Sequence, residues 1–349
     1  MTPEITIAGR QIGADQPPYV ICELSGNHNG SLDRALAMIE AAAATGCDAI
    51  KLQTYTADTL TLDCDGPGFR IEEGPWAGRT LYDLYAEACT PYEWHAALFE
   101  RARRLGVTLF STPFDESAVE LLESLGAPAY KIASFEAIDL PLIARVAACR
   151  KPMIISTGLA SLAEMREALD TAQAGGAAGA ALLHCVSAYP APIDEANVRT
   201  VPDLARRFGV VTGLSDHTPG SAAAVAAVAL GAAIIEKHFT LARADGGPDA
   251  AFSLEPAEFA AMTADCKAAW SALGSATYDE LGSERAAAGH RRSLYVAADV
   301  KAGETLRAAN VRSVRPGFGL PPKHLREVLG RRATRDLKFG EPLAWDMLA

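Results

Sequence analysis

Short apolar segments alternate with longer amphipathic segments over roughly the first 270 residues. The apolar segments predict strands and the amphipathic ones predict helices. A helical pattern lies between each neighbouring pair of strands, and another, residues 255–273, follows the last strand. The predicted strands span residues 19–24, 49–54, 108–113, 129–134, 152–157, 181–186, 210–215 and 233–238.

Eight strands with helical connections predict an α/β fold, a closed (β/α)8 TIM barrel, whose usual size is ~250 residues. The alternative is an open doubly wound sheet, which usually carries a glycine-rich phosphate-binding motif after an early strand. The sequence contains neither G-x-G-x-x-G nor a Walker A motif. The longest insertion, residues 55–90, follows the second strand, on the face where barrel loops build active sites. Its Gly, Pro and aromatic residues predict an ordered loop that shapes a substrate pocket.

The strand and helix alternation stops near Ser275. The tail contains short β-like segments (SLYVAA, VRSVRP) and turn signals (KAGE, KFGE, PGFG), which predict a separate small domain. We therefore expect a barrel domain over residues 1–280, a linker over 281–290 and a small domain over 291–349. A domain of about 60 residues buries only ~60% of its surface on folding. We expect it to lean on the barrel or on a partner chain.

Composition narrows the class of partner. The formal net charge of −11 argues against nucleic acids and anionic membranes, although a local pair of lysines in a cleft can still bind a small anion. No apolar run approaches the ~18 residues of a membrane span, and the N-terminal residues lack the pattern of a secretion signal. The seven cysteines are odd in number and form no CxxC pair, which is typical of free thiols in a reducing cytoplasm. We expect a cytoplasmic protein.

Every predicted strand ends in polar residues. In a TIM barrel these ends converge on one mouth, where the chemistry takes place. One polar end means little, but eight together are hard to explain as packing. The strand ends supply, in chain order, Glu23, Lys51 and Gln53, Ser111 and Thr112, Lys131 and Ser134, Ser156 and Thr157, His184, Ser187 and Tyr189, Ser215 and His217, and Glu236 to His238.

Side chains two residues apart on a strand share a face. Glu236 and His238 are therefore predicted to point together, as are Lys51 and Gln53. Lys237 is predicted to point the other way, towards the helices or solvent.

Two histidines, His217 and His238, end adjacent predicted strands. Neighbouring strands lie ~4.8 Å apart, so both imidazoles could bind one ion. Two imidazoles with an amide or water suit Mn²⁺, Zn²⁺ or Fe²⁺ better than Ca²⁺. The alternative is a pair of hydrogen-bonded structural histidines.

Lys51 and Lys131 lie inside apolar strands, where a lone ammonium group is costly to bury. A phosphate, or a phosphate with a carboxylate, would neutralise them. One alternative is internal salt bridges to Glu23, Glu136 or Glu236. A lysine Schiff base is another, but it would leave the histidines unexplained. Hydroxyl donors for the same anion are Thr112, Ser134, Ser156 and Ser215.

The order of these motifs is that of a known family. The chain contains, in sequence, CELSGNHNGSL, KLQTYTADTLTL, STPF, YKIASFE, STG, GLSDHT and IEKHFT. With them it resembles the sialic acid synthase family over nearly its whole length. The tail, SLYVAADVKAGE followed by SVRPGFGLPPK, resembles that family's small antifreeze-like (SAF) domain.

The resemblance implies that the protein condenses phosphoenolpyruvate with an acetamido sugar and releases phosphate. Motifs such as ELSGNH, YTADTLTLD and SVRPGFGL favour 2,4-diacetamido-2,4,6-trideoxy-L-altrose as that sugar. The sugars that lead to legionaminic or N-acetylneuraminic acid are alternatives within the family. A metal-dependent aldolase that uses free pyruvate and a non-catalytic sugar-binding protein are the alternatives outside it.

The resemblance also implies roles for individual residues. His217 and His238 match divalent metal ligands, with Gln53 nearby; Mn²⁺ is expected, with Mg²⁺ or Co²⁺ as alternatives. Glu23 and Tyr189 match residues at the acceptor sugar. The matching phosphoenolpyruvate site consists of Lys51, Thr112, Lys131, Ser134, Ser156 and Ser215.

Three further residues complete the expected site. Ser187 stands where N-acetylneuraminate synthases tend to have Asn, and we expect it to contact phosphoenolpyruvate as a shorter substitute. Glu236, like Glu23, is a candidate for the base that activates water. Arg315 matches an arginine that the small domain of one subunit inserts into its partner's active site, which implies a domain-swapped homodimer.

Overall fold

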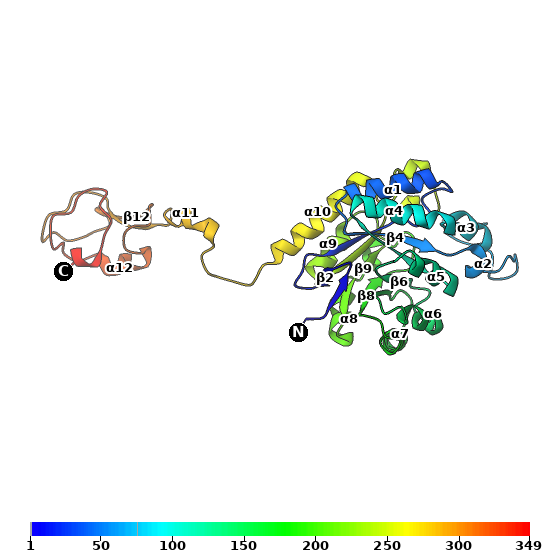
Figure 1. Cartoon of the computed structure of the whole chain (residues 1–349). Helices are drawn as coiled ribbons and strands as arrows, with labels where there is room; N and C mark the ends of the chain where they lie inside the picture. Colours follow the sequence, from blue (N-terminus) through cyan, green and yellow to red (C-terminus); the bar gives the residue numbers. More distant parts are fainter. Residues whose placement is uncertain (1, 75) are drawn as a thin grey trace. The chain divides into compact units, whose positions relative to one another are not determined.

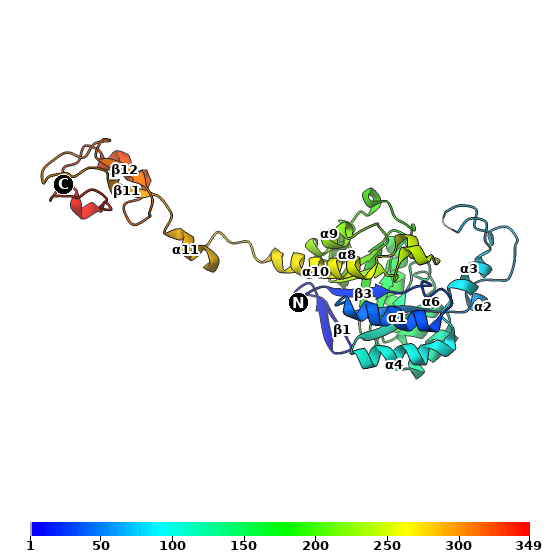
Figure 2. The same ribbon diagram turned by 90° about the horizontal axis from the view of Figure 1, so that it is seen from above.

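The computed structural model describes residues 2–74 and 76–349, which fold as two compact units, one ending at Gly274 and one beginning at Ser275 (Figure 1). The first unit is a closed barrel of eight parallel strands with helices around it (Figure 2). Sequential strands are neighbours, and the last strand pairs with the first to close the barrel. The predicted TIM barrel is confirmed.

Each barrel strand begins and ends within two residues of its predicted bounds. The strands are β3 (Tyr19–Glu23), β4 (Ala49–Thr54), β5 (Thr108–Pro113), β6 (Tyr130–Ile132), β7 (Met153–Ser156), β8 (Ala180–Cys185), β9 (Val211–Asp216) and β10 (Ile234–His238). The helices after them are α1 (Leu32–Ala44), α4 (His95–Leu105), α5 (Glu116–Ser124), α6 (Leu140–Ala147), α7 (Leu162–Ala174), α8 (Thr200–Phe208), α9 (Ala222–Ala229) and α10 (Pro256–Leu273).

Polar side chains at the helix starts fix the loops that form the barrel mouth. Ser31 accepts a hydrogen bond from a backbone N–H in the first turn of α1, and Asp115 accepts two in the first turn of α5. Ser161 and Glu164 form a capping box at the start of α7. Each cap satisfies N–H groups that have no partner within the helix, and so fixes where the preceding loop ends.

A β-hairpin that the sequence analysis did not predict precedes the barrel. Its strands are β1 (Glu4–Ile7) and β2 (Arg10–Gly13). Ile5, Ile7 and Ile12 are buried and join the apolar cluster inside the barrel. The hairpin therefore completes the core at the end of the barrel opposite the strand ends that carry polar side chains.

The insertion between β4 and α4 contains α2 (Ala57–Leu60) and α3 (Leu81–Ala88). Trp76, from the same insertion, donates a hydrogen bond from its indole Nε1 to the carbonyl of Pro248 at 2.8 Å. Pro248 lies in the loop after β10. The insertion is thus tied across the mouth of the barrel.

The second unit has its own small core of leucine, valine and alanine side chains. It contains the antiparallel pair β11 (Ser293–Val296) and β12 (Val311–Val314), with the short helices α11 (Arg285–Ala288) and α12 (Leu325–Val328). In the part of the chain that the structure describes, no helix is long and apolar enough to cross a membrane.

Candidate active site

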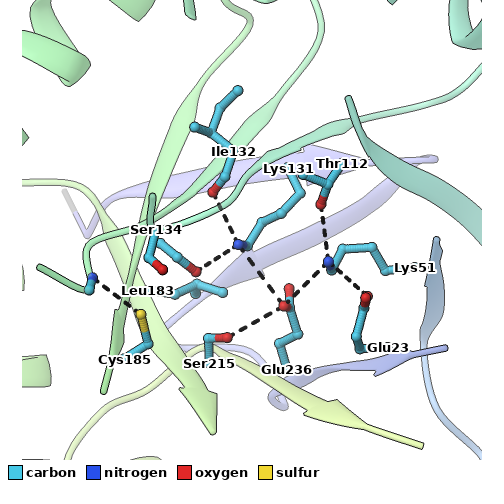
Figure 3. Close-up of polar contacts among 12 residues, drawn as sticks. Glu23, Lys51, Thr112, Lys131, Ile132, Ser134, Leu183, Cys185, Ser215 and Glu236 are labelled. Atoms are coloured by element: carbon cyan, nitrogen blue, oxygen red, sulfur yellow. Dashed lines mark hydrogen bonds and ion pairs between the residues drawn. The ribbon is translucent and has the colours of Figure 1, made fainter. Parts of the chain in front are cut away.

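Two lysines and two glutamates meet at the mouth of the barrel (Figure 3). The Nζ atom of Lys51 lies 2.7 Å from Oε2 of Glu23 and 3.6 Å from Oε1 of Glu236. The Nζ atom of Lys131 lies 4.0 Å from Oε1 of Glu236. All four side chains are at most 5% exposed. The internal ion pairs that the sequence analysis kept as an alternative are therefore present, and we call these four residues the ion cluster.

Hydroxyl groups surround the two ammonium groups. Lys51 donates a hydrogen bond to Oγ1 of Thr112 at 3.0 Å. Lys131 donates to Oγ of Ser156 at 2.6 Å and to the carbonyl of Ile132 at 3.1 Å. Ser215 donates to Oε1 of Glu236 at 3.4 Å. Five strands, β4, β5, β6, β7 and β9, thus bring these cations and hydroxyls, all of them among the predicted site residues, to one buried region.

Ser134 and Ser187 lie beside this region and are 2.8 Å apart at their hydroxyl oxygens. Gly158 makes this approach possible. A Cβ atom at Gly158 would lie 2.4 Å from Cβ of Ser134 and 2.5 Å from Oγ of Ser187, closer than any side chain allows. Its φ of +32° also favours glycine.

Charge within the ion cluster is divided unequally. Burial, reinforced by the charge of Glu236, raises the pKa of Glu23. Burial would also raise the pKa of Glu236, but the ammonium groups of Lys131 and Lys51 hold it below its ordinary value. Glu236 therefore stays ionised, while Glu23 is the carboxylate that takes up a proton more readily. Gln53 holds Glu23 in place by donating a hydrogen bond to its Oε1 at 2.9 Å.

The imidazoles of His217 and His238 lie side by side, with ring centroids 5.4 Å apart. His217 donates a hydrogen bond from Nδ1 to the carbonyl of Val186 at 2.9 Å, so its Nε2 carries a lone pair. Nδ1 of His238 is buried and has no hydrogen-bond partner among residues 2–74 and 76–349. Burial lowers the pKa of both histidines, so both are neutral, as metal ligands must be.

The two histidines fit part of a metal site. Two neutral, adjacent imidazoles, one with an unsatisfied buried nitrogen, suit a divalent ion such as Mn²⁺. Within the described ranges, however, no group of three or more His, Cys, Asp or Glu side chains could hold one ion together. The remaining ligands would have to be an amide, water or substrate oxygens.

Aromatic side chains form one wall of the mouth. The ring of Tyr189 lies 4.4 Å from that of His217 and 6.0 Å from that of Trp76, measured between centroids. The ring of Phe252 lies 5.5 Å from Tyr189 and 5.1 Å from His238. A substrate molecule bound beside the two histidines would therefore contact an aromatic surface.

Two carboxyl groups at the mouth were missing from the predicted site. Oδ2 of Asp249 lies 3.8 Å from Nδ1 of His238, Asp249 accepts a hydrogen bond from Ser25, and burial raises its pKa to about 6. Burial also raises the pKa of Glu136 to about 7, and its Oε2 has no hydrogen-bond partner in the described chain. Glu136 was considered as a salt-bridge partner for the lysines, but the lysines pair with Glu23 and Glu236 instead. The sequence signal that could have identified Asp249 and Glu136 is that each is a carboxylate in a loop after a strand that carries site residues.

Arg315 stands apart from the other predicted residues. It lies in the second unit, directly after β12, with its side chain exposed. Its approach to a barrel mouth stays a prediction. The remaining predicted residues all lie on the barrel strands or in the loops that follow them.

Comparisons with known proteins place the chain among nonulosonic acid synthases. It is 45% identical to the pseudaminic acid synthase of Campylobacter jejuni, over 95% of this chain and 98% of that protein. It is 34% identical to the N,N'-diacetyllegionaminic acid synthase of Legionella pneumophila, over 96% of this chain and 95% of that protein. The solved structure of the N-acetylneuraminic acid synthetase of Leptospira borgpetersenii matches with a TM-score of 0.74 at 31% identity, over 82% and 95%.

Two family matches divide the chain. Residues 291–349 match the SAF domain, so the predicted antifreeze-like tail is confirmed. Residues 38–278 match the NeuB family, within the barrel unit. Together with the identities above, this match confirms the predicted resemblance: the chain belongs to the NeuB family.

Proposed function

We propose that the protein is a pseudaminic acid synthase, which condenses phosphoenolpyruvate with 2,4-diacetamido-2,4,6-trideoxy-L-altrose and water to give pseudaminic acid and phosphate. The choice of sugar is supported by the higher identity to the pseudaminic acid synthase than to the legionaminic acid synthase, 45% against 34%. The reaction type is supported by one observation above all. Lys51 and Lys131 are buried side by side among hydroxyl donors, where a small polyanion can be held.

In this proposal, phosphoenolpyruvate binds at the ion cluster. The substrate's phosphate and carboxylate would contact Lys51 and Lys131 and the hydroxyls of Thr112 and Ser156. Charge-assisted hydrogen bonds of this kind are short and directional, so they also fix the orientation of the substrate. Ser134, Ser187 and Ser215 extend the same surface. The role of the lysines is then to orient the enol carbon towards the sugar, without any covalent bond to them.

The bond-forming step joins C3 of phosphoenolpyruvate to the aldehyde carbon of the open-chain sugar. A divalent ion, Mn²⁺ with Mg²⁺ or Co²⁺ as alternatives, held by His217 and His238 would supply a Lewis acid for the aldehyde oxygen. Attack from C3 leaves positive character at C2. Glu236, ionised between the two lysines, stabilises that charge. Water adds at C2, and C–O cleavage then releases phosphate.

A proton must leave the water that adds at C2. We assign this proton to Glu23, because burial makes its carboxylate the stronger base of the two glutamates. Gln53 and Lys51 hold that carboxylate by hydrogen bonding and ion pairing. Glu236 is less suited, since the ammonium groups lower its pKa.

The SAF domain and the subunit arrangement belong to the same proposal. We assign the protein to a domain-swapped homodimer in which Arg315 of one chain enters the active site of the other chain's barrel. The support is the match to the family's tail and the exposed position of Arg315. A cytoplasmic location is supported by the seven free cysteines.

Phosphate release tests the reaction directly. The protein would be incubated with phosphoenolpyruvate and Mn²⁺ together with the altrose sugar, with the legionaminic acid precursor or with N-acetylmannosamine, and the nonulosonic acid identified by mass spectrometry. We expect the highest kcat/KM with the altrose sugar. A higher value with another sugar would reassign the acceptor. Activity with free pyruvate and no phosphate release would overturn the reaction type.

A further inference from the structure

A second buried ion pair lies directly behind the two histidines. Nζ of Lys237 is 2.7 Å from Oδ2 of Asp216, and the two side chains are 0% and 1% exposed. Lys237 stands opposite Asp216 in the β9–β10 register. Both point away from the barrel interior, as alternation predicts for Lys237. This pair is more deeply buried than any ion pair of the described chain outside the ion cluster.

The pair ties down the turn that carries His217. Oδ1 of Asp216 accepts hydrogen bonds from the backbone N–H of Thr218 at 2.9 Å and from its hydroxyl at 2.8 Å. Lys237 also donates a hydrogen bond to the carbonyl of Thr218. The residues on both sides of His217 are thus joined to each other and to β10. The carbonyl of His217 accepts a further hydrogen bond from the N–H of Ala191 at 3.0 Å.

The same lysine adjoins the second histidine. Lys237 is followed directly by His238, whose side chain lies on the other face of β10. One ammonium group therefore links the strand that carries His238 to the turn that carries His217. This link adds to the pairing of β9 with β10 and to the contact between the two rings, and it fixes the turn that carries His217 against the strand that carries His238.

A contribution to stability does not by itself explain why the ion pair of Lys237 with Asp216 is buried here. Burying two charges costs desolvation, and well-packed apolar residues are often at least as stabilising as a buried ion pair. What an ion pair adds is a fixed geometry, since each charge accepts few alternative partners. Groups that hydrogen-bond to metal-binding side chains and orient them commonly change metal affinity by a factor of about 10–100. Lys237 and Asp216 would act on the same orientation through the backbone on either side of His217.

We propose that Lys237 and Asp216 are positioning residues that set the spacing of His217 and His238, and that they thereby give the barrel mouth its affinity for a divalent ion. This inference rests on the proposed function, in which the two histidines hold that ion. Neither side chain points into the barrel mouth, where substrate would bind. Their removal should weaken metal binding while leaving the lysines and hydroxyls of the ion cluster in place.

The double variant Asp216→Asn/Lys237→Met separates positioning from stability, because it leaves no unpaired buried charge. Mn²⁺ binding would be measured by electron paramagnetic resonance of the free ion, and folding by circular dichroism and the Tm. We expect a Tm close to that of the unmodified protein and a loss of Mn²⁺ affinity of at least ~10-fold. Phosphoenolpyruvate affinity, measured by calorimetry without metal, should change by less than about 3-fold.

Arg10→Met is the matched control. It removes the ion pair of Arg10 with Asp48 at the opposite end of the barrel. We expect it to lower the Tm without changing Mn²⁺ affinity. A folded double variant with unchanged Mn²⁺ affinity would overturn the inference, as would an unmodified protein that binds no Mn²⁺.

A milder variant covers the case in which the double variant does not fold. Thr218→Val removes one hydrogen bond to Asp216 and no charge. A reduced Mn²⁺ affinity at an unchanged Tm would support the inference, and an unchanged affinity would overturn it. Phosphate release by the unmodified protein tests the proposed function separately, so failure of the positioning role leaves the function standing.

Discussion

The ammonium group of Lys51 lies 2.7 Å from the carboxylate of Glu23, and both side chains are buried at the barrel mouth. Glu236 lies on the other side of the same ammonium group, at 3.6 Å. Two lysines and two glutamates therefore balance one another before any substrate anion arrives. A substrate with several negative charges would compete with the two carboxylates for the ammonium groups, and Glu23 is the carboxylate with the raised pKa.

Removal of Lys131 should weaken phosphoenolpyruvate binding. Hydrogen bonds to charged groups contribute about 1.5–3 kcal/mol, so Lys131→Met should raise the KM for phosphoenolpyruvate by roughly 10- to 150-fold. The KM would be measured by phosphate release at saturating sugar. Lys151→Met is the control, because Lys151 pairs with Glu123 at a partly exposed position. An unchanged KM for Lys131→Met would contradict the anion site.

His238→Ala should remove divalent-metal binding and with it most of the activity. If the ion activates the aldehyde, kcat should fall by at least about 100-fold, a loss of roughly 3 kcal/mol of transition-state stabilisation. Treatment of the unmodified protein with EDTA should give the same loss, and Mn²⁺ should reverse it. His184→Gln is the control, since His184 is hydrogen-bonded to the carbonyl of Ala196. Near-normal turnover by His238→Ala would refute the metal role.

Glu136 should make stability depend on pH. Burial raises the pKa of this carboxyl to about 7, so the folded protein holds the proton more tightly than the unfolded chain does. Ionisation of Glu136 therefore destabilises the fold progressively as the pH rises from about 4.5 to about 7. Above pH 7, Glu136→Gln should be more stable than the unmodified protein by on the order of 2 kcal/mol, and this advantage should vanish near pH 4.5.

Thermal unfolding at several pH values measures this difference. Glu120→Gln, at an exposed position on α5, serves as the control for the substitution itself. A constant difference in Tm between Glu136→Gln and the unmodified protein across pH 4.5–8 would show that Glu136 does not titrate in this range.

Much of the site was predictable because parallel strands in a barrel all end at one mouth. Polar residues at the ends of β4, β6 and β10 had to converge whatever their detailed contacts, and alternation separated Lys237 from Glu236 and His238. The pairing of Lys51 with Glu23 was one of three possibilities, beside an anion site and a Schiff base, because the pattern gives faces and not distances. Sequence could not choose between a paired and an unpaired lysine.

Other features lacked a usable pattern. Asp249 lies in a loop, ADGGPDA, where no periodicity indicates which carboxylate turns inward. The hairpin β1–β2 was missed because each strand has only four residues, too short for alternation to be distinctive. Its role in closing the barrel core depends on tertiary packing that no local pattern records.

Trp76 should affect the sugar and not phosphoenolpyruvate. Its ring lies beside Tyr189, and its hydrogen bond to Pro248 fixes it across the mouth. In Trp76→Ala the sugar loses an aromatic contact worth about 1 kcal/mol and is less well buried. The KM for the sugar should therefore rise about 10-fold. Trp270→Ala is the control, because Trp270 donates a comparable hydrogen bond to Ala14 away from the mouth. Equal changes in both KM values would argue against a sugar-binding role.

Mixed dimers test whether Arg315 acts in the partner's site. Arg315→Ala and His238→Ala chains should each be inactive alone. If each site combines one chain's barrel with the other chain's SAF domain, a heterodimer of the two variants has one intact site and one doubly defective site. Random pairing at equal amounts should then restore about a quarter of the unmodified activity, since half of the dimers are mixed.

Tagged chains purified sequentially give the heterodimer itself, which should reach about half of the unmodified activity per dimer. Arg315→Lys keeps the positive charge but loses the planar guanidinium group. Its activity should therefore be little higher than that of Arg315→Ala. If Arg315 instead acted within its own chain, every site of the heterodimer would carry one defect. The mixture would then stay inactive, and the swapped arrangement would have to be abandoned although the protein could remain a dimer.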